Sequence, residues 1–295
     1  MTADDLAAPR AAFSVLSHEV RLDILLSLFE KWEGEWTEPR GYAELMQTVG
    51  IEDSGQFNYH LNELRGSYIR RVDDGYVPTA AATALYRAVL ANRPMEDADR
   101  TLHVDFSCPT CDGKLIVEYR RGFLSVQCSS CESPASRYTY PFPANGLTDR
   151  SDTDVLLTFH RRLRSHLALA RDGQCPFCTA RTTRDLVTGT PSILSQSDSQ
   201  TDVFAKIECL KCTFQVAIDP LVAIRDDVRI VCALRTLEIA TVDTFDWELP
   251  TPDYTVHECP FQIELVVESD EGTLLATVDD SLSVLSIQSE ADCSM

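Results

Sequence analysis

The sequence predicts an α+β fold, with a helical N-terminal part followed by a cysteine-bearing part that mixes strands and helices. Residues 1–95 contain no cysteine, and their apolar residues recur at the three- and four-residue spacing of helices. All 11 cysteines come later, and eight of them form four CxxC pairs among stretches that alternate as strands do. We expect a first domain over 10–95, a small cysteine-bearing unit over 100–147, a connecting helix over 148–173, and a second cysteine-bearing unit with a small α+β extension over 174–295.

The charge of the chain limits its possible partners. The 295 residues carry a formal net charge of -20, and only four of the 26 basic residues are lysine. This arginine bias resembles that of proteins from salt-loving archaea. Near 1 M salt the screening length falls to about 3 Å, so a distant acidic surface hardly repels a polyanion. Residues 1–95 hold 9 Lys and Arg against 14 Asp and Glu, so most of the excess negative charge lies in the later part.

The sequence also indicates where the protein works. No apolar run approaches the roughly 20 residues that cross a bilayer, and the first residues lack the pattern of a secretory signal. We therefore expect a cytoplasmic protein without membrane contact. In a reducing compartment, CxxC pairs favour metal binding over disulfides.

The N-terminal part is predicted to begin with one long helix over 11–34 that is apolar on two faces, and is therefore central or shared with a partner. Its two stripes are Phe13, Leu16, Val20, Ile24 and Leu28, and Leu22, Leu25, Leu26 and Phe29. A short helix follows with Tyr42, Leu45, Met46 and Val49 on one face, and Gly50 can end it in the left-handed conformation.

After the turn at 51–53, Ser54 can cap a third helix. Its predicted buried residues are Phe57, Leu61 and Leu64, and its predicted outward residues are Gln56, Asn58, Tyr59 and Asn62. Two short helices joined by a tight turn with glycine form a helix-turn-helix.

A hairpin and a last helix complete the N-terminal part. The stretch 68–79, "YIRRVDDGYVPT", contains two short strand-like runs around Asp74-Gly75, a dipeptide suited to a tight hairpin. Thr79 can cap the last helix, which Pro94 ends and which forms core or a dimer contact. The residues expected on one face of that helix are Ala82, Leu85, Tyr86 and Val89.

Residues 16–25, "LSHEVRLDIL", and 57–72, "FNYHLNELRGSYIRRV", resemble the winged helix-turn-helix of ArsR-type regulators, and the resemblance covers residues 10–93. It departs from the family in having Glu19 where proline is usual, and in lacking the cysteine metal-sensing box on this domain. The resemblance implies a DNA-binding domain, and the second departure argues against arsenite or heavy-metal sensing by it. The whole layout resembles haloarchaeal regulators with a cysteine-bearing C-terminal region.

A recognition helix of about twelve residues spans about 18 Å and fits a major groove about 12 Å wide. Neutral side chains that carry both a donor and an acceptor can read bases, and arginine can hold phosphate. The predicted DNA-contacting residues are Ser54, Gln56, Asn58, Tyr59, Asn62, Arg70 and Arg71. For His60 we favour a histidine hydrogen-bonded within the core over a base reader, and for His18 a role in orienting the first helical turn.

The cysteine pairs have the spacing of metal knuckles. Sixteen residues separate the first two pairs and are expected to form a hairpin, which is typical of a zinc ribbon, whereas thirty residues separate the second two. The predicted ligands of two structural Zn²⁺ ions are Cys108, Cys111, Cys128 and Cys131, and Cys175, Cys178, Cys209 and Cys212. Exchange of knuckles between the sets stays open. Cys232, Cys259 and Cys293 are interpreted as small buried apolar residues or a tail residue.

Between the two sets, residues 151–173 are expected to form a helix that Gly173 ends. Its predicted buried residues are Leu156, Phe159, Leu163, Leu167 and Ala170, and a solvated face is favoured over DNA contact for Arg161, Arg162 and Arg164. A further helix over 225–239 and a hairpin with one more strand over 261–287 would close a small α+β unit.

These features predict a sequence-specific transcription regulator that binds double-stranded DNA as a homodimer, because one recognition helix covers only a half-site. Two alternatives stay open: an adaptor whose zinc ribbons bind the transcription machinery or another protein, and a thiol or zinc sensor. An enzyme is not expected. The sequence has no HExxH motif, nucleophile elbow or glycine-rich phosphate loop, and four cysteines around zinc leave no open position for water.

Overall fold

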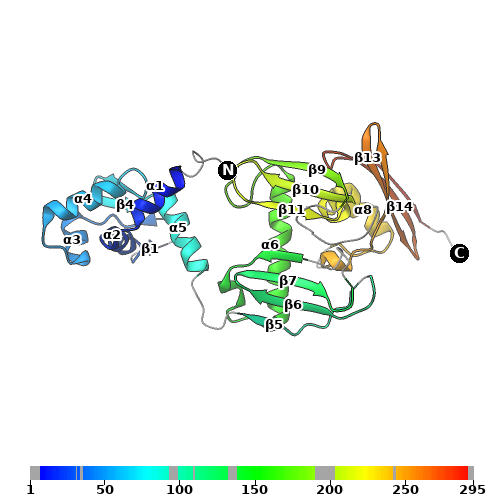
Figure 1. Ribbon diagram of the computed structural model, residues 1–295, viewed down its shortest axis with the longest axis horizontal. Helices are drawn as coiled ribbons and strands as arrows, with labels where there is room; N and C mark the ends of the chain where they lie inside the picture. The colour runs from blue at the N-terminus through cyan, green and yellow to red at the C-terminus, as the bar shows by residue number, and fades with distance from the viewer. Residues whose placement is uncertain are drawn as a thin grey trace. The chain divides into compact units, whose positions relative to one another are not determined.

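The chain forms a mixed α+β structure of two compact units, Met1–Arg93 and Pro94–Met295 (Figure 1). The computed structural model describes residues 7–30, 32–33, 36–92, 99–108, 110–131, 138–189, 203–241 and 244–291. The first unit ends close to residue 95, where the sequence predicts a domain boundary. None of the helices within these ranges offers the length of apolar sequence that crossing a bilayer requires.

The N-terminal unit is mainly helical. Its helices are α1 (Ala7–Leu16), α2 (Glu19–Phe29), α3 (Tyr42–Val49), α4 (Ser54–Leu64) and α5 (Ala80–Ala91), and its strands are β1 (Trp32–Glu33), β2 (Trp36–Thr37), β3 (Ile69–Val72) and β4 (Gly75–Pro78). The two strand pairs are antiparallel. The core contains fully buried side chains from α2, α3, α4 and β3.

The single helix predicted over 11–34 is wrong, because the chain breaks between α1 and α2. His18 has extended backbone angles, and its Nδ1 accepts a hydrogen bond from the Val20 N–H at 3.3 Å, which caps α2. The apolar residues assigned to two stripes of one helix are therefore divided between α1 and α2. Four apolar residues of α2 are buried, whereas Phe13, Leu22 and Leu26 are exposed.

The turn between α3 and α4 confirms the predicted end of α3 and corrects the predicted cap of α4. Gly50 adopts the left-handed conformation with φ 72° and caps α3 as predicted. The N-cap of α4 is Asp53, and Ser54 is the first helical residue. The Asp53 Oδ1 accepts hydrogen bonds from the N–H groups of Gly55 at 2.7 Å and Gln56 at 3.1 Å. A carboxylate at this position also favours the positive end of the helix dipole, so aspartate is preferred over the neighbouring serine.

Buried Arg40 joins α2 to α3. Its guanidinium donates to the Ser27 carbonyl at 2.6 Å and the Thr48 hydroxyl at 2.9 Å, and pairs with Glu30 and Glu44 at 3.0 Å each. The charge is buried but fully partnered, which is the condition under which a buried cation is tolerated. The backbone of Arg40 also pairs with β4 at Tyr76.

The β3–β4 hairpin turns one residue earlier than predicted, at Asp73-Asp74, because Val72 pairs with Gly75. Glycine is required at position 75 because the backbone of Arg40 lies too close to leave room for a side chain. Its φ is 150°, and a Cβ there would lie 2.3 Å from the Arg40 carbonyl oxygen. Thr79 caps α5 as predicted, and Pro94 lies outside the described residues. Of the four residues expected on one face, Ala82 is buried and Val89 is exposed.

The described residues of the C-terminal unit form three antiparallel sheets (Figure 1). Their strands are β5 (Arg100–Leu102), β6 (Leu115–Arg120), β7 (Phe123–Cys128) and β8 (Tyr138–Pro141); β9 (Thr182–Thr188), β10 (Val203–Cys209) and β11 (Gln215–Ile218); and β12 (Asp253–Glu258), β13 (Phe261–Ser269), β14 (Gly272–Asp279) and β15 (Val284–Ala291). The helices are η3 (Ala144–Leu147), α6 (Asp152–Arg171), α7 (Pro220–Ile224), α8 (Val228–Thr236) and η5 (Asp246–Glu248). One hydrophobic core runs through all three sheets, so the later predicted segments do not form separate cores.

Helix α6 connects the first two sheets and contacts β9 and β10 (Figure 1). Ser151 caps it, its five predicted core residues are all buried, and Gly173 follows it with φ 87°. The helix predicted over 225–239 is wrong in extent, because Asp227 caps α8 and the helix begins only at Val228. The buried Arg225 precedes this cap and pairs with Asp246. The last sheet has β12 in addition to the predicted hairpin and strand.

The capping of α4 predicts a difference between two adjacent residues. Asp53→Ala should lower the free energy of unfolding of the N-terminal unit by about 1 kcal/mol, because two helix N–H groups lose their acceptor. Ser54→Ala should change it little, and serves as the matched control. Urea titration in concentrated KCl, followed by circular dichroism, measures both. Equal losses for the two variants would contradict the assignment of Asp53 as the cap.

Candidate metal centres and nucleic-acid interface

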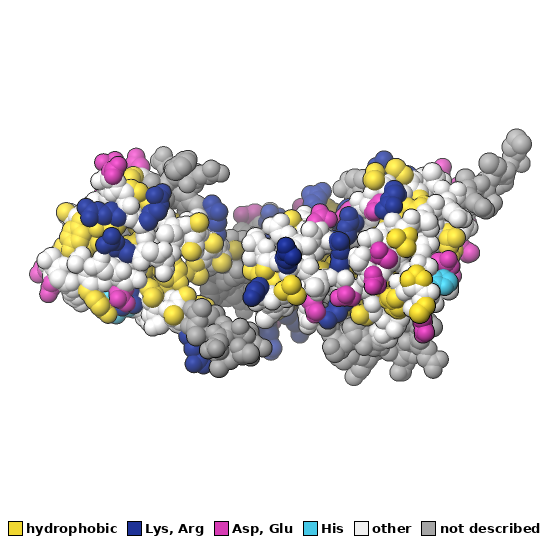
Figure 2. Space-filling model, turned by 90° about the horizontal axis from the view of Figure 1, so that it is seen from above, with side chains coloured by type: hydrophobic (Ala, Val, Ile, Leu, Met, Phe, Trp, Pro, Cys, Tyr) yellow, Lys and Arg dark blue, Asp and Glu magenta, His cyan; other side chains and the backbone are white. Residues whose placement is uncertain are grey.

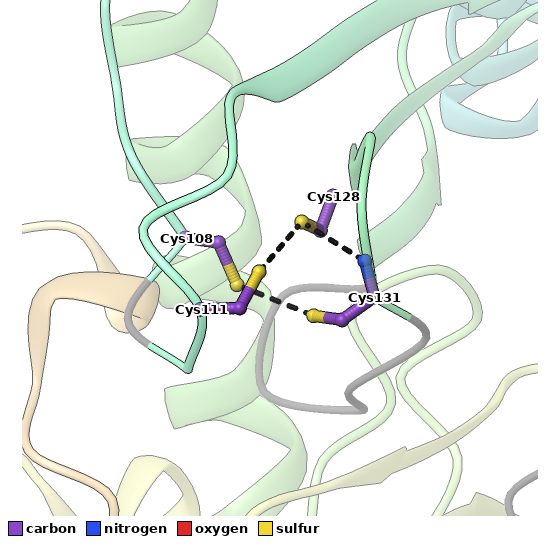
Figure 3. Close-up of side chains that lie close together, drawn as sticks. All are labelled: Cys108, Cys111, Cys128 and Cys131. Atoms are coloured by element: carbon purple, nitrogen blue, oxygen red, sulfur yellow. Dashed lines mark hydrogen bonds between the residues drawn. The ribbon is translucent and has the colours of Figure 1, made fainter.

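The eight predicted ligand cysteines form two groups of four. Cys108, Cys111, Cys128 and Cys131 form one group, and Cys175, Cys178, Cys209 and Cys212 form the other, each with all sulfurs within 4.8 Å of one another. Figure 3 shows the first group, in which the side chains of two loops point toward one another. The grouping answers the question of exchange between the sets, since each group takes its ligands from consecutive CxxC pairs.

The two groups are built by the same backbone turn. In the first, the Cys108 N–H donates to the Gly113 carbonyl at 2.7 Å, and Asp112 has φ 55°. In the second, the Cys175 N–H donates to the Ala180 carbonyl at 2.8 Å, and Thr179 has φ 60°. Each turn leads into one strand of a hairpin, β6–β7 or β9–β10, and the other strand ends at the second CxxC pair.

The sulfur distances fit a bound metal better than disulfides. The nearest sulfurs are 3.5 Å apart for Cys111 and Cys128, and 3.6 Å apart for Cys108 and Cys131. The second group has the same distances of 3.5 and 3.6 Å. A disulfide would require about 2.05 Å. Four thiolates around zinc at about 2.3 Å are separated by about 3.8 Å, so small shifts of these side chains would complete a tetrahedron.

The thiols within each group differ in how readily they ionise. Desolvation raises the pKa of the Cys209 thiol, but hydrogen bonds from the Cys212 and Lys211 N–H groups outweigh it and lower the pKa to about 6. Desolvation and the adjoining sulfurs raise the pKa of Cys212 to about 12. In the first group the Ser130 N–H lowers the pKa of Cys128. Neighbouring thiolates repel one another, so four can ionise together only around a cation.

The prediction that the remaining cysteines are buried is wrong for the two that the structure describes. Cys232 and Cys259 are exposed rather than buried, and neither belongs to a metal-binding group within the described ranges. Cys293 lies outside the described residues.

The polar residues predicted to read DNA share the exposed side of α4. Phe57, Leu61 and Leu64 are fully buried. The exposed residues on the helix include Ser54, Gln56, Asn58, Tyr59 and Asn62, and we call the last four the polar face of α4. The helix is therefore oriented as predicted.

Arg70 and Arg71 on β3 are both exposed, although they are neighbours on a strand. The tip of the hairpin carries Asp73 and Asp74 instead, so cationic contact would come from the strand. Sequence reasoning missed exposed Arg65, directly after α4, which donates to the Asn62 Oδ1 at 3.1 Å. Its position three residues after Asn62 was the available signal, because such a spacing brings side chains together on a helix.

His60 is buried on the other side of α4, as predicted for a core residue. Its ring lies 4.1 Å from the ring of His18, measured between centroids. The expected hydrogen bond is not made at Nδ1, which has no partner within the described part of the chain. Burial, followed by the charges of His18 and Arg21, lowers the pKa of His60, so folding favours its neutral form.

The two groups predict the metal content of the protein. The purified chain should contain two metal ions, and Cys128→Ser should reduce this to one, because three sulfurs leave the first group incomplete. Metal analysis by mass spectrometry, after removal of loosely bound ions, measures the ratio. Cys232→Ser is the control and should keep both ions. A wild-type chain without metal, or a Cys128→Ser chain that keeps two, would refute the assignment.

Two family models match the chain, one in each unit. A family model described as a domain of unknown function, DUF7347, matches residues 9–89, which include α3, α4 and the β3–β4 hairpin. A second model with the same description, DUF7351, matches residues 105–284, which include both cysteine groups. The chain matches no curated protein and no solved structure. Because the second model covers more than half of its residues, the chain belongs to the DUF7351 family.

Proposed function

We propose that the chain is a sequence-specific transcription regulator whose N-terminal unit is a winged helix-turn-helix of the ArsR type. In this proposal α4 enters the major groove of double-stranded DNA and the β3–β4 hairpin contacts the backbone. The observation that carries it is the orientation of α4, whose apolar side is buried while its polar face is open to solvent. Polar side chains that do not pack in the core are free to contact the bases of DNA.

The dimensions and charge of α4 suit this role. Its eleven residues span about 17 Å at 1.5 Å per residue, and a major groove is about 12 Å wide. Glu63 carries the one carboxylate of the helix, and Arg21 pairs with it at 3.4 Å. The polar face itself is neutral. Gln56 and Asn58 carry the paired donor and acceptor that can recognise adenine.

Three exposed arginines follow the polar face of α4 in the sequence. Arg65 follows α4, and Arg70 and Arg71 lie on β3, so all three can approach phosphates on either side of a groove. Figure 2 shows Lys and Arg side chains gathered on one face of the N-terminal unit. The formal charge of the whole chain opposes DNA binding at low salt, but it is screened over about 3 Å near 1 M salt.

The cysteine groups fit a structural role in this proposal. We propose that each holds Zn²⁺ as a zinc ribbon, because four sulfurs fill a tetrahedral site and leave no position for a reacting water. The metal would fasten the two ends of each hairpin to the core of the C-terminal unit. We also propose a homodimer, since two copies of α4 can read two half-sites.

Two sets of substitutions separate base reading from phosphate contact. Asn58→Ala should cost about 1 to 3 kcal/mol on the duplex that the protein enriches from sheared genomic DNA, and little on random duplex. Arg70→Gln together with Arg71→Gln should weaken binding to both duplexes alike, because phosphates carry no sequence information. Fluorescence anisotropy in concentrated KCl measures the four affinities.

Gln215→Ala, an exposed amide in the C-terminal unit, is the matched control and should bind as wild type does. Equal losses on both duplexes for Asn58→Ala would remove Asn58 as a base reader. The same affinity for enriched and random DNA in the wild type would refute sequence-specific regulation.

A further inference from the structure

The two cysteine groups share their backbone geometry but differ in the residues at their tips. The exposed residues within the CxxC pairs of the first group are Thr110, Ser129 and Ser130, which are small and polar. The corresponding residues of the second group include Phe177, Leu210 and Lys211. Phe177 is 48% exposed and Leu210 is 58% exposed. A metal site does not require apolar tips, since the first group is built without them.

The segment that leads into the second group is rich in arginine, whereas the chain as a whole is acidic. Residues 155–184 contain six arginines and one carboxylate, Asp172, in a protein with a net charge of -20. Three cations here, Arg162, Arg181 and Lys211, take part in none of the ion pairs found among the described residues. These three cations are therefore not neutralised by an ion pair of their own among the described residues.

Contacts connect these cations to the exposed apolar tips. Arg162 and His166 are one turn apart on α6, and the His166 ring lies 5.2 Å from the ring of Phe177 between centroids. On the other side, the Leu210 N–H donates to the Arg181 carbonyl at 3.0 Å, and Lys211 follows Leu210. We call Arg162, Phe177, Arg181, Leu210 and Lys211 the knuckle surface.

Phe177 is held firmly although half of it is open. Its ring contacts Phe214 at 5.6 Å and Tyr140 at 6.3 Å between centroids, and the Tyr140 hydroxyl is 2.8 Å from the His166 Nδ1. These neighbours come from β8, α6 and the second cysteine group. An aromatic ring fixed by its surroundings loses little freedom when a second ring stacks on its open side.

We propose that the knuckle surface binds single-stranded nucleic acid, with a base stacked on Phe177 and phosphates held by Arg181, Lys211 and Arg162. Aromatic side chains between cations are the arrangement by which proteins bind single strands without reading sequence. Stacking does not depend on charge, so it persists at salt concentrations that weaken phosphate contacts. An acidic peptide would use the cations but would leave the aromatic platform without a planar partner.

This surface lies in a different unit from the polar face of α4, so the inference stands apart from the proposed function of the N-terminal unit. The zinc-loaded full chain is titrated with labelled oligo-dT and oligo-rU of about 20 nucleotides, enough to exceed a site of about 4 to 16. A duplex of the same length and poly-glutamate serve as competitors. Comparison of the two oligonucleotides distinguishes DNA from RNA as the natural strand.

Phe177→Leu keeps apolar contact with Phe214 and Tyr140 but removes the aromatic face. It should weaken binding about 5- to 150-fold, as expected from stacking of about 1 to 3 kcal/mol per base. Arg181→Gln together with Lys211→Gln should weaken binding and lower the slope of log affinity against log salt by about 1.4. Lys114→Gln, an exposed cation near the first cysteine group, should have no effect.

Each variant is checked for two bound metal ions, so that loss of binding is not loss of the fold. The proposal is overturned if neither oligonucleotide binds, if poly-glutamate displaces them more readily than unlabelled oligonucleotide does, or if Phe177→Leu binds as wild type does. Displacement of the labelled strand by the duplex more readily than by unlabelled oligonucleotide would equally overturn it. None of these results bears on sequence-specific duplex binding through α4.

Discussion

The burial of Phe57, Leu61 and Leu64 is the constraint on which the N-terminal unit depends. All three side chains are fully buried, and turning α4 would expose them to water at a cost of about 1.5 to 3 kcal/mol for each. The polar face of α4 therefore has one stable orientation. Asp53 fixes where the helix begins, and Arg40 ties the preceding helices and the hairpin to the same core. The exposed polar side chains are thus presented on a rigid element, which is what recognition of a regular groove requires.

In the C-terminal unit, cysteines gather at the ends of two hairpins. Its hairpins β6–β7 and β9–β10 belong to larger sheets that share one core, and the two ends of each hairpin meet at four sulfurs. The two groups have the same turns and sulfur spacings, so differences between them report on something besides metal binding. The polar tips of the first group and the apolar, basic tips of the second are the clearest of those differences. In an acidic chain, such local exceptions carry more information than the total charge.

The sequence predicts much of this structure because local signals dominate where it succeeds. Gly50, Thr79 and the buried stripe of α6 each follow from the chain close by, and all three are confirmed. The CxxC pairs come together in two groups of four, as their spacing predicts. The errors arise where a tertiary contact decides. The break at His18 places its ring against His60, and the hairpin turn moves because Gly75 meets the backbone of Arg40. The exposure of Cys232 and Cys259 depends on distant packing that no short pattern encodes. DNA contact itself stays a prediction.

Hydrogen–deuterium exchange of the full chain, with and without duplex enriched from genomic DNA in concentrated KCl, tests the central claim most directly. The account predicts slower exchange at the backbone amides of α4 and β3 when DNA is bound, because contact excludes water and restrains opening of these elements. Unchanged exchange in α4 and β3, with protection confined to residues 105–284, would contradict it.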